Sequence, residues 1–146
     1  MGTDVDFYLV KKDENDVYHY VADLDYSNRC YALFGWLANV RNYSDIPNIS
    51  ELTYVKLEHN FEENYLIGSY SIVSCRILRT FDYDQPVEDR RVTVQTGPRS
   101  WNGGATCKPG GGKMTTYRDL FDDEWFEIIN ELTEEDDDLY LLSAFN

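Results

Sequence analysis

The pattern of apolar and polar residues at the start of the chain predicts a β-hairpin. Residues 5–10 and 17–21 are rich in β-branched and aromatic side chains, and the polar run 11–16 between them is typical of a turn. Residues 29–40 carry apolar side chains three and four positions apart, which indicates a helix with one apolar face. We therefore expect a hairpin followed by a short amphipathic helix.

A second hairpin is predicted in the middle of the chain. Residues 66–81 alternate between apolar and polar side chains, which favours one long strand or two strands joined by a bulge at Gly68. A turn over residues 82–89 would return the chain to an antiparallel partner strand at residues 91–95. Six of the nine glycines lie in residues 97–112, so we expect a loop there.

The last part of the chain predicts a second amphipathic helix. Thr116 and Asp119 resemble a capping box, and apolar side chains recur at helical spacing from there to about Leu132. The acidic residues 133–138 would cap one more short element, which ends in the apolar segment 139–145. The order hairpin, helix, hairpin, helix predicts a single α+β domain spanning the whole chain. Its antiparallel sheet would come from two hairpins and would pack with two main helices.

Acidic residues dominate the composition and lie mainly at the two ends of the chain. The 146 residues include 27 Asp and Glu against 13 Lys and Arg, for a net charge of −14. Residues 1–25 hold seven carboxylates and two lysines, and residues 116–146 hold eleven carboxylates and one arginine. The affinity of a protein for nucleic acid depends largely on Lys and Arg. We therefore expect no direct binding to nucleic acid, and we expect the acidic ends to attract a basic protein partner.

Other features of the composition bound the class of protein. Aromatic residues make up 15% of the chain, which argues against intrinsic disorder. No apolar run approaches the roughly 20 residues of a membrane-spanning helix, and the N-terminus has no signal-peptide pattern. Cys30, Cys75 and Cys107 are odd in number and widely spaced, which favours reduced thiols over disulfides or a zinc site. We expect a cytoplasmic protein without a membrane partner.

The glycine-rich loop is the first candidate for chemistry. It ends in a Gly-Lys step, but Cys107 and Met114 stand where a phosphate-binding P-loop needs Gly and then Ser or Thr. Its backbone N–H groups and basic side chains could still bind an anion near the start of the next helix. A binder of a small anionic nucleotide signal is therefore the alternative function, although a plain surface loop is the commoner outcome. The side chains expected to hold that ligand are Arg99, Trp101, Lys108 and Lys113.

Metal and enzyme chemistry find little support in the sequence. Asp4 and Asp6 would share one face of an extended strand and could hold a hard cation. A metal-dependent hydrolase is the least favoured function, because charge on an edge strand explains the pair more simply. His19 and His59 fit no metal-binding spacing, and the chain has no nucleophile motif. We expect no cofactor and no resident metal, and the sequence favours a non-catalytic protein.

Two segments near the N-terminus resemble a known family. The chain opens Met-Gly-Thr-Asp-Val-Asp, and residues 28–43 read Asn-Arg-Cys-Tyr-Ala-Leu-Phe-Gly-Trp-Leu-Ala-Asn-Val-Arg-Asn-Tyr. This pattern is similar to a family of small phage and prophage proteins that open with Met-Gly-Cys-Asp-Ile-His. The likeness covers mainly residues 1–50 and the helix start at residues 115–120. It implies a phage setting and no particular activity. Asp6 stands where the family has His, so a metal site made by such histidines would be lost here.

The acidic ends and the phage-like segments together give the leading hypothesis. We expect a non-catalytic inhibitor, encoded by a phage, that binds a basic nucleic-acid-handling host protein such as a CRISPR effector or a restriction enzyme. Its carboxylates would act as a DNA mimic in a groove that normally holds phosphates. The residues expected on one side of the second helix are Asp119, Asp122, Asp123 and Glu127. The full set expected to contact the partner is Asp119, Asp122, Asp123, Glu124, Glu127, Glu134, Asp136, Asp137 and Asp138.

Overall fold

The structure is a computed structural model in which the chain forms two compact units. It describes residues 2–58, 69–93 and 106–146. Unit 1 consists of Met1–Arg29, Ser50–Phe81 and Asp123–Asn146, and unit 2 consists of Cys30–Ile49 and Asp82–Asp122. A compact unit need not fold on its own, so the single domain expected over residues 1–146 stays a prediction.

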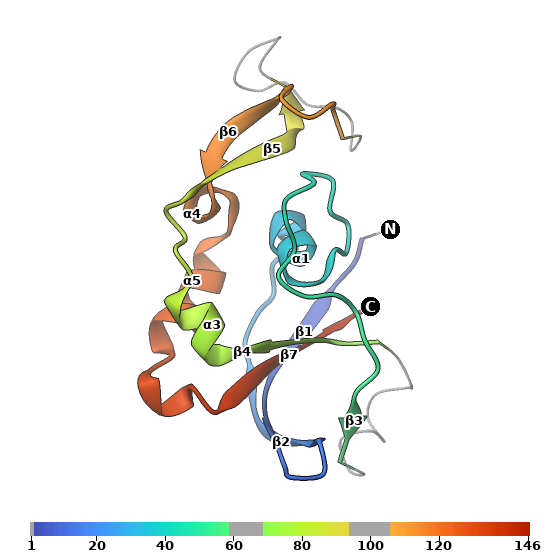
Figure 1. The fold of residues 1–146 in the computed structure, drawn as a ribbon, viewed down its shortest axis with the longest axis vertical. Helices are drawn as coiled ribbons and strands as arrows, with labels where there is room; N and C mark the ends of the chain where they lie inside the picture. The colour runs from blue at the N-terminus through green and yellow to red at the C-terminus, as the bar shows by residue number, and fades with distance from the viewer. Residues whose placement is uncertain (1, 59–68, 94–105) are drawn as a thin grey trace. The chain divides into compact units, whose positions relative to one another are not determined.

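The described part of unit 1 contains a five-stranded sheet with the order β3-β2-β1-β7-β4 (Figure 1). The strands are β1 (Val5–Lys12), β2 (Val17–Leu24), β3 (Lys56–Leu57), β4 (Ser71–Ser74) and β7 (Leu139–Phe145). β1 and β2 form the predicted N-terminal hairpin, with Phe7 opposite Leu24 and Lys12 opposite Tyr18. β3 runs parallel to β2, and the other neighbours are antiparallel. The α+β class is confirmed, but the sheet is mixed and does not consist of two hairpins.

The C-terminal segment supplies a central strand that the sequence did not reveal. β7 lies between β1 and β4 and pairs with β1 from the start of that strand, where Val5 is opposite Phe145. Leu141 and Leu142 are both buried, although neighbouring side chains of a strand point to opposite faces of the sheet. Burial on both faces removes the alternation that marks a half-exposed strand. A segment of this length is also too short to be assigned to strand or helix by length alone.

Within the described residues, unit 1 also contains α3 (Cys75–Thr80), α5 (Asp123–Glu131) and the short 3-10 helix η1 (Glu134–Asp136). The long strand predicted over residues 66–81 is wrong after Ser74, because α3 begins there. The Ser74 hydroxyl accepts a hydrogen bond from the Arg76 N–H at 3.2 Å and caps this helix. Cys75 and Leu78 are buried at a spacing of three residues, which suits a helix, while the same segment also alternates like a strand.

Side chains of unit 1 cover both faces of its sheet. On one face, Phe7 packs against Tyr26 and Trp125, with ring centroids 4.9 Å and 5.7 Å away. On the other face, a buried cluster contains Tyr8, Val10, Leu57, Tyr70, Leu142 and Ala144. β1 is therefore buried on both sides, which fixes its register. Asp6, near the start of β1, remains exposed.

Unit 2 is organised around helix α1. Its described elements are α1 (Tyr31–Ala38), β5 (Pro86–Thr93), β6 (Gly112–Thr116) and α4 (Tyr117–Leu120). α1 confirms the helix predicted over residues 29–40. Its fully buried Trp36 packs against Tyr83 and Phe121, with ring centroids 5.7 Å and 5.1 Å away. These aromatic rings form the core of unit 2.

The second predicted hairpin has a different partner in the structure. β5 pairs with β6, and not with residues 66–81 as expected. The predicted turn over residues 82–89 is shorter, because Pro86 begins the strand. Proline is tolerated at the first residue of a strand, where its missing N–H removes no bond of the ladder interior. Residues 94–95, the glycine-rich residues 97–105 and the expected bulge at Gly68 lie outside the described residues.

The helix predicted from Thr116 onward is two helices. Its start is confirmed, since the Thr116 hydroxyl accepts a hydrogen bond from the Asp119 N–H at 3.2 Å. α4 ends at Leu120, the next residue Phe121 has an extended backbone with φ −90° and ψ 156°, and α5 begins at Asp123. Phe121 packs in the core of unit 2, whereas Trp125 packs in the core of unit 1. The single apolar stripe in the sequence is therefore divided between the two units.

Candidate functional site

The net charge of the protein lies entirely in unit 1. The sequence ranges of unit 1 hold 20 Asp and Glu against six Lys and Arg, whereas those of unit 2 hold seven of each. β1 belongs to the acidic N-terminal segment, β7 follows the acidic run near the C-terminus, and the two strands are neighbours in the sheet. The fold thus brings the acidic N-terminal end and residues 123–146 of the acidic C-terminal end into one unit.

Part of this charge is compensated inside unit 1. Arg29 Nε donates to Asp4 Oδ1 at 2.6 Å, and the Arg79 guanidinium donates to both oxygens of Asp137 at 3.0 Å and 2.8 Å. The hydrogen bond from Arg79 lowers the pKa of the Asp137 carboxyl, and the bond from Arg29 lowers the pKa of Asp4 in the same way. Asp137 is therefore already bound within its own unit. Asp4, which the sequence paired with Asp6 as a metal ligand, is bound to Arg29 instead.

Two further carboxylates of the expected partner-binding set have structural roles in unit 1. Glu124 accepts hydrogen bonds from the Ser27 N–H at 2.6 Å and from the Ser27 hydroxyl at 3.2 Å. Asp136 accepts a hydrogen bond from the Thr133 N–H at 2.9 Å and completes the capping box of η1. Their negative charge remains, but their orientation is set by these bonds.

The remaining members of the set are distributed over both units. The exposed members in unit 1 are Asp123, Glu127, Glu134 and Asp138, and the members in unit 2 are Asp119 and Asp122. The chain is not helical at residues 121–122, between α4 and α5. The prediction that Asp119, Asp122, Asp123 and Glu127 share one side of one helix is therefore wrong.

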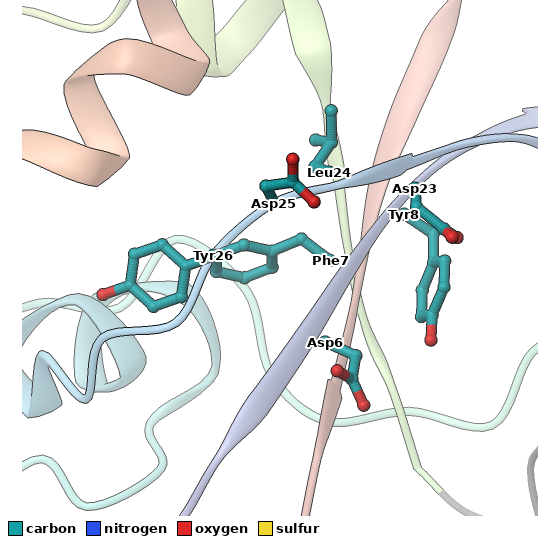
Figure 2. A pocket seen from close by; sticks show the side chains of 7 residues that line it. All are labelled: Asp6, Phe7, Tyr8, Asp23, Leu24, Asp25 and Tyr26. Carbon is teal, nitrogen blue, oxygen red and sulfur yellow. The ribbon is translucent and has the colours of Figure 1, made fainter.

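Unit 1 contains an acidic cavity of about 220 Å³ where β1 begins and β2 ends (Figure 2). Its lining residues are Asp6, Phe7, Tyr8, Asp23, Leu24, Asp25 and Tyr26. Figure 2 shows the carboxylates of Asp6, Asp23 and Asp25 well apart from one another. Three separated carboxylates suit an extended cationic group better than a small metal ion, whose oxygen ligands lie within about 2.6 Å. Among the described residues, no three His, Cys, Asp or Glu side chains are grouped to hold a metal.

Of these lining residues, only Asp6 was a candidate ligand on the sequence alone. Asp23 and Asp25 alternate just beyond the strand predicted over residues 17–21, where β2 ends, and Asp4 and Asp6 alternate where β1 begins. In an antiparallel hairpin these two places are adjacent, and Tyr8 is indeed opposite Asp23. The register of the hairpin was therefore the signal that could have identified the cavity.

A second cluster in unit 1 joins three ionisable side chains that are separated in the sequence. The Nε2 atom of His19 lies 2.7 Å from Asp13 Oδ2, and its Nδ1 atom lies 2.8 Å from Glu58 Oε2. The bond with Asp13, followed by that with Glu58, raises the pKa of the His19 imidazole, and the bonds with His19 lower the pKa of both carboxyls. The carboxylates bind opposite edges of the ring, so the three groups do not converge on one ion. Glu58 is 39 residues from His19, and no sequence signal linked them.

The described part of the glycine-rich loop, in unit 2, already binds a carboxylate. Glu88 on β5 accepts hydrogen bonds from the N–H groups of Gly110 at 3.2 Å and Gly112 at 3.0 Å. Lys108 and Lys113 are exposed. Two of the N–H groups available for an anion are thus taken by a residue of the same hairpin, which does not favour the nucleotide-binding alternative. The other two residues of that alternative, Arg99 and Trp101, lie outside the described residues.

Comparison with known proteins assigns no family to this chain, so the class of protein is described by its fold and its charge distribution alone. No protein-family model, no curated protein and no solved structure matches the chain. In the parts of the chain that the structure describes, no helix is both long and apolar enough to cross a membrane. The protein is a small α+β protein with one strongly acidic unit and one unit whose formal charges balance.

Proposed function

We propose that this protein is a non-catalytic, phage-encoded inhibitor that binds a basic nucleic-acid-handling protein in the host cytoplasm. The target class is a CRISPR effector or a restriction enzyme, and the role is counter-defence or host takeover. The single observation that carries the proposal is the concentration of the whole net charge of −14 in unit 1. The phage setting rests on the resemblance of the N-terminal segments to small phage proteins.

An acidic surface suits such a target for an electrostatic reason. A groove that binds nucleic acid is lined with Lys and Arg, and it attracts a dense array of negative charge. Unit 1 offers the carboxylates that line its cavity and a second group of exposed ones on α5 and after it, namely Asp123, Glu127, Glu134 and Asp138. The inhibitor would compete with DNA for the groove, and its charge would speed the encounter.

The proposal is tested by measuring the binding of this protein to a panel of purified CRISPR effectors and restriction enzymes, with and without their DNA substrates. We expect binding to at least one effector, competition with DNA, and inhibition of DNA cleavage. Affinity should fall steeply between about 50 and about 500 mM NaCl, because the Debye length shortens from roughly 14 Å to roughly 4 Å. Absence of binding across the panel, or tight binding that salt does not change, contradicts the proposal.

Two double variants, each of which loses two carboxylates, test which unit carries the binding surface. Glu127→Gln with Glu134→Gln removes two exposed charges from unit 1, and Asp119→Asn with Asp122→Asn removes one exposed and one half-buried charge from unit 2. We expect the first pair to weaken binding and the second to leave it close to wild type. An equal loss with both pairs would show that only the net charge matters, and the assignment of the surface to unit 1 would then be wrong.

A further inference from the structure

His19 lies between two carboxylates that are themselves fixed by the backbone. Asp13 Oδ1 accepts hydrogen bonds from two backbone N–H groups of its own turn, at 2.8 Å and 3.0 Å. Glu58 Oε1 accepts a hydrogen bond from the Tyr20 N–H at 3.2 Å. The second oxygen of each carboxylate faces one ring nitrogen of His19, at 2.7 Å for Asp13 and 2.8 Å for Glu58. Both carboxylates are therefore held in place as acceptors.

Both contacts of the ring can be hydrogen bonds only when the imidazole carries two protons. A neutral imidazole has one N–H and one bare nitrogen, so it donates to one carboxylate and turns a lone pair toward the other. A lone pair that faces a carboxylate oxygen at this distance is repelled by it. A neutral ring could also make two hydrogen bonds if one of the carboxylates were protonated. This state is disfavoured, because each carboxylate accepts backbone N–H bonds that favour its ionised form.

We propose that Asp13, His19 and Glu58 form a proton-dependent clamp, which holds strand β3 against β2 while the imidazole is protonated and releases this edge when the proton leaves. The backbone connection that the clamp reinforces is short. In the part of the chain that the structure describes, β3 pairs with β2 at Val17 and Tyr18, and a further bond joins the Glu58 N–H to the Tyr18 carbonyl at 3.0 Å. The side-chain bonds of Glu58 reinforce this short pairing, in addition to the buried Leu57 side chain. The clamp does not depend on the proposed inhibitor function.

Glu58 is the partner that leaves the neutral ring. Asp13 is six residues from His19 within one hairpin, and its position is fixed by its own turn. Glu58 comes from a segment 39 residues away that is attached through a two-residue strand. The preceding Leu57 side chain is 6% exposed and packs in the core of unit 1. Opening is therefore a local change at the edge of the sheet, and not unfolding of the unit.

The direction of the pH dependence follows from the charges around His19. Among the described residues, the charged groups near it are Asp13 in the turn, Glu58 after β3, its partner Lys11 on β1, and Lys56 on β3. The bonds to the two carboxylates dominate and raise the pKa of His19 in the folded protein. The clamp therefore contributes its full stability below the unfolded pKa of about 6.5 and loses it as the pH rises through the folded pKa. The edge should open on the alkaline side of 6.5.

The test is an NMR titration of the wild-type protein from about pH 5 to about pH 9, which spans the charge change of a histidine. A His59→Gln variant leaves one histidine and assigns the His19 ring signals. We expect a His19 pKa above 6.5, and amide shifts of Leu57 and Glu58 with the same midpoint. Above that midpoint, the Glu58 N–H should exchange faster than base catalysis alone predicts. A His19 pKa at or below about 6.5, or amides that do not follow it, would overturn the proposal.

Two variants separate the clamp from a general charge effect. In Glu58→Gln a neutral amide N–H can donate to the bare ring nitrogen, so we expect the His19 pKa to fall and the pH response of the Leu57 amide to disappear. Glu14→Gln removes the same charge from an exposed residue of the β1–β2 turn and should leave both unchanged. Equal effects of the two variants would contradict the clamp. The wild-type titration decides the matter even if Glu58→Gln does not fold.

Discussion

Gly35 in helix α1 should resist replacement by alanine, although alanine is the better helix former. A Cβ atom at this position would lie 2.6 Å from Cγ and 2.8 Å from Cβ of Asn42. The Asn42 side chain cannot simply move away, because it holds the following loop. Its Oδ1 accepts a hydrogen bond from the Ile46 N–H at 3.1 Å, and its Nδ2 donates to the Ile46 carbonyl at 2.9 Å. Gly35→Ala would therefore force Asn42 out of a site where it makes two backbone bonds.

The loop that Asn42 holds has a demanding backbone. Asn39, Arg41 and Asp45 have φ angles of 58°, 50° and 50°, a region that residues other than glycine rarely adopt. Asn42 also donates to the Asn39 side chain at 3.0 Å. The loop therefore has little freedom to follow a displaced Asn42, and the bonds to Ile46 should be lost rather than rearranged.

The magnitudes decide the sign of the effect. Alanine in place of glycine in a helix contributes about 1 kcal/mol of stability. Loss of two hydrogen bonds costs about 1 kcal/mol each, and more where a buried group is left without a partner. Gly35→Ala should therefore lower the free energy of unfolding by about 1 to 2 kcal/mol in spite of the better propensity.

A double-mutant cycle measured by urea unfolding at 25 °C tests this reasoning. Asn42→Ala alone should cost about 2 kcal/mol, because it removes both bonds to Ile46, and the exposed bond to the Asn39 side chain adds little. Once the Asn42 side chain is gone, the methyl group introduced by Gly35→Ala has space. The glycine substitution in that background should therefore be neutral or should stabilise by up to about 1 kcal/mol. A single Gly35→Ala variant more stable than wild type, or additive effects in the double variant, would refute the argument.

Three further outcomes follow from single side chains. Leu142→Ala should lower the free energy of unfolding in urea by about 2–5 kcal/mol, because Leu142 is fully buried in β7. Leu139 is partly exposed, so Leu139→Ala should lower it less. Asp137→Asn should be less stable than wild type at pH 7, because Arg79 lowers the pKa of the Asp137 carboxyl; the difference in melting temperature should vanish as the pH falls through that lowered value. Glu88→Ala should speed hydrogen exchange of the Gly110 and Gly112 amides, and unchanged NMR exchange rates would contradict their assigned bonds.

The elements predicted correctly are those whose residues obey one period only. The N-terminal hairpin and α1 each have a single clear pattern, and the cap at Thr116 has a specific local signature. Residues 75–80 obey both the strand and the helix period, so the pattern could not exclude the wrong one. No Gly or Pro marks the break at Phe121, and its contact with Trp36 joins residues too far apart in the sequence for the local pattern to indicate it.

The candidate site was predictable only as far as charge along the chain determines it. The acidic ends were evident in the sequence, but their meeting in one unit depends on β7 lying beside β1, and β7 was not recognised. The clamp at His19 depends on a parallel contact between β2 and β3, and that contact has no local signature. In both cases the missing information is the pairing of strands that are far apart in the sequence.

The distribution of charge also predicts how salt affects stability. Unit 1 holds 20 carboxylates against six cations, so repulsion within it should exceed the attraction of its ion pairs. Such pairs, for example Arg29 with Asp4, contribute only about 0–1 kcal/mol each when exposed. Salt screens both the repulsion between carboxylates and the attraction within the ion pairs, and the repulsion is the larger of the two. The melting temperature at pH 7 should therefore rise as NaCl increases from about 20 to about 500 mM. Near pH 4.3, where the net charge is close to zero, the rise should vanish or reverse, which separates screening from a general salt effect. A melting temperature that falls with NaCl at pH 7 would show that the ion pairs dominate.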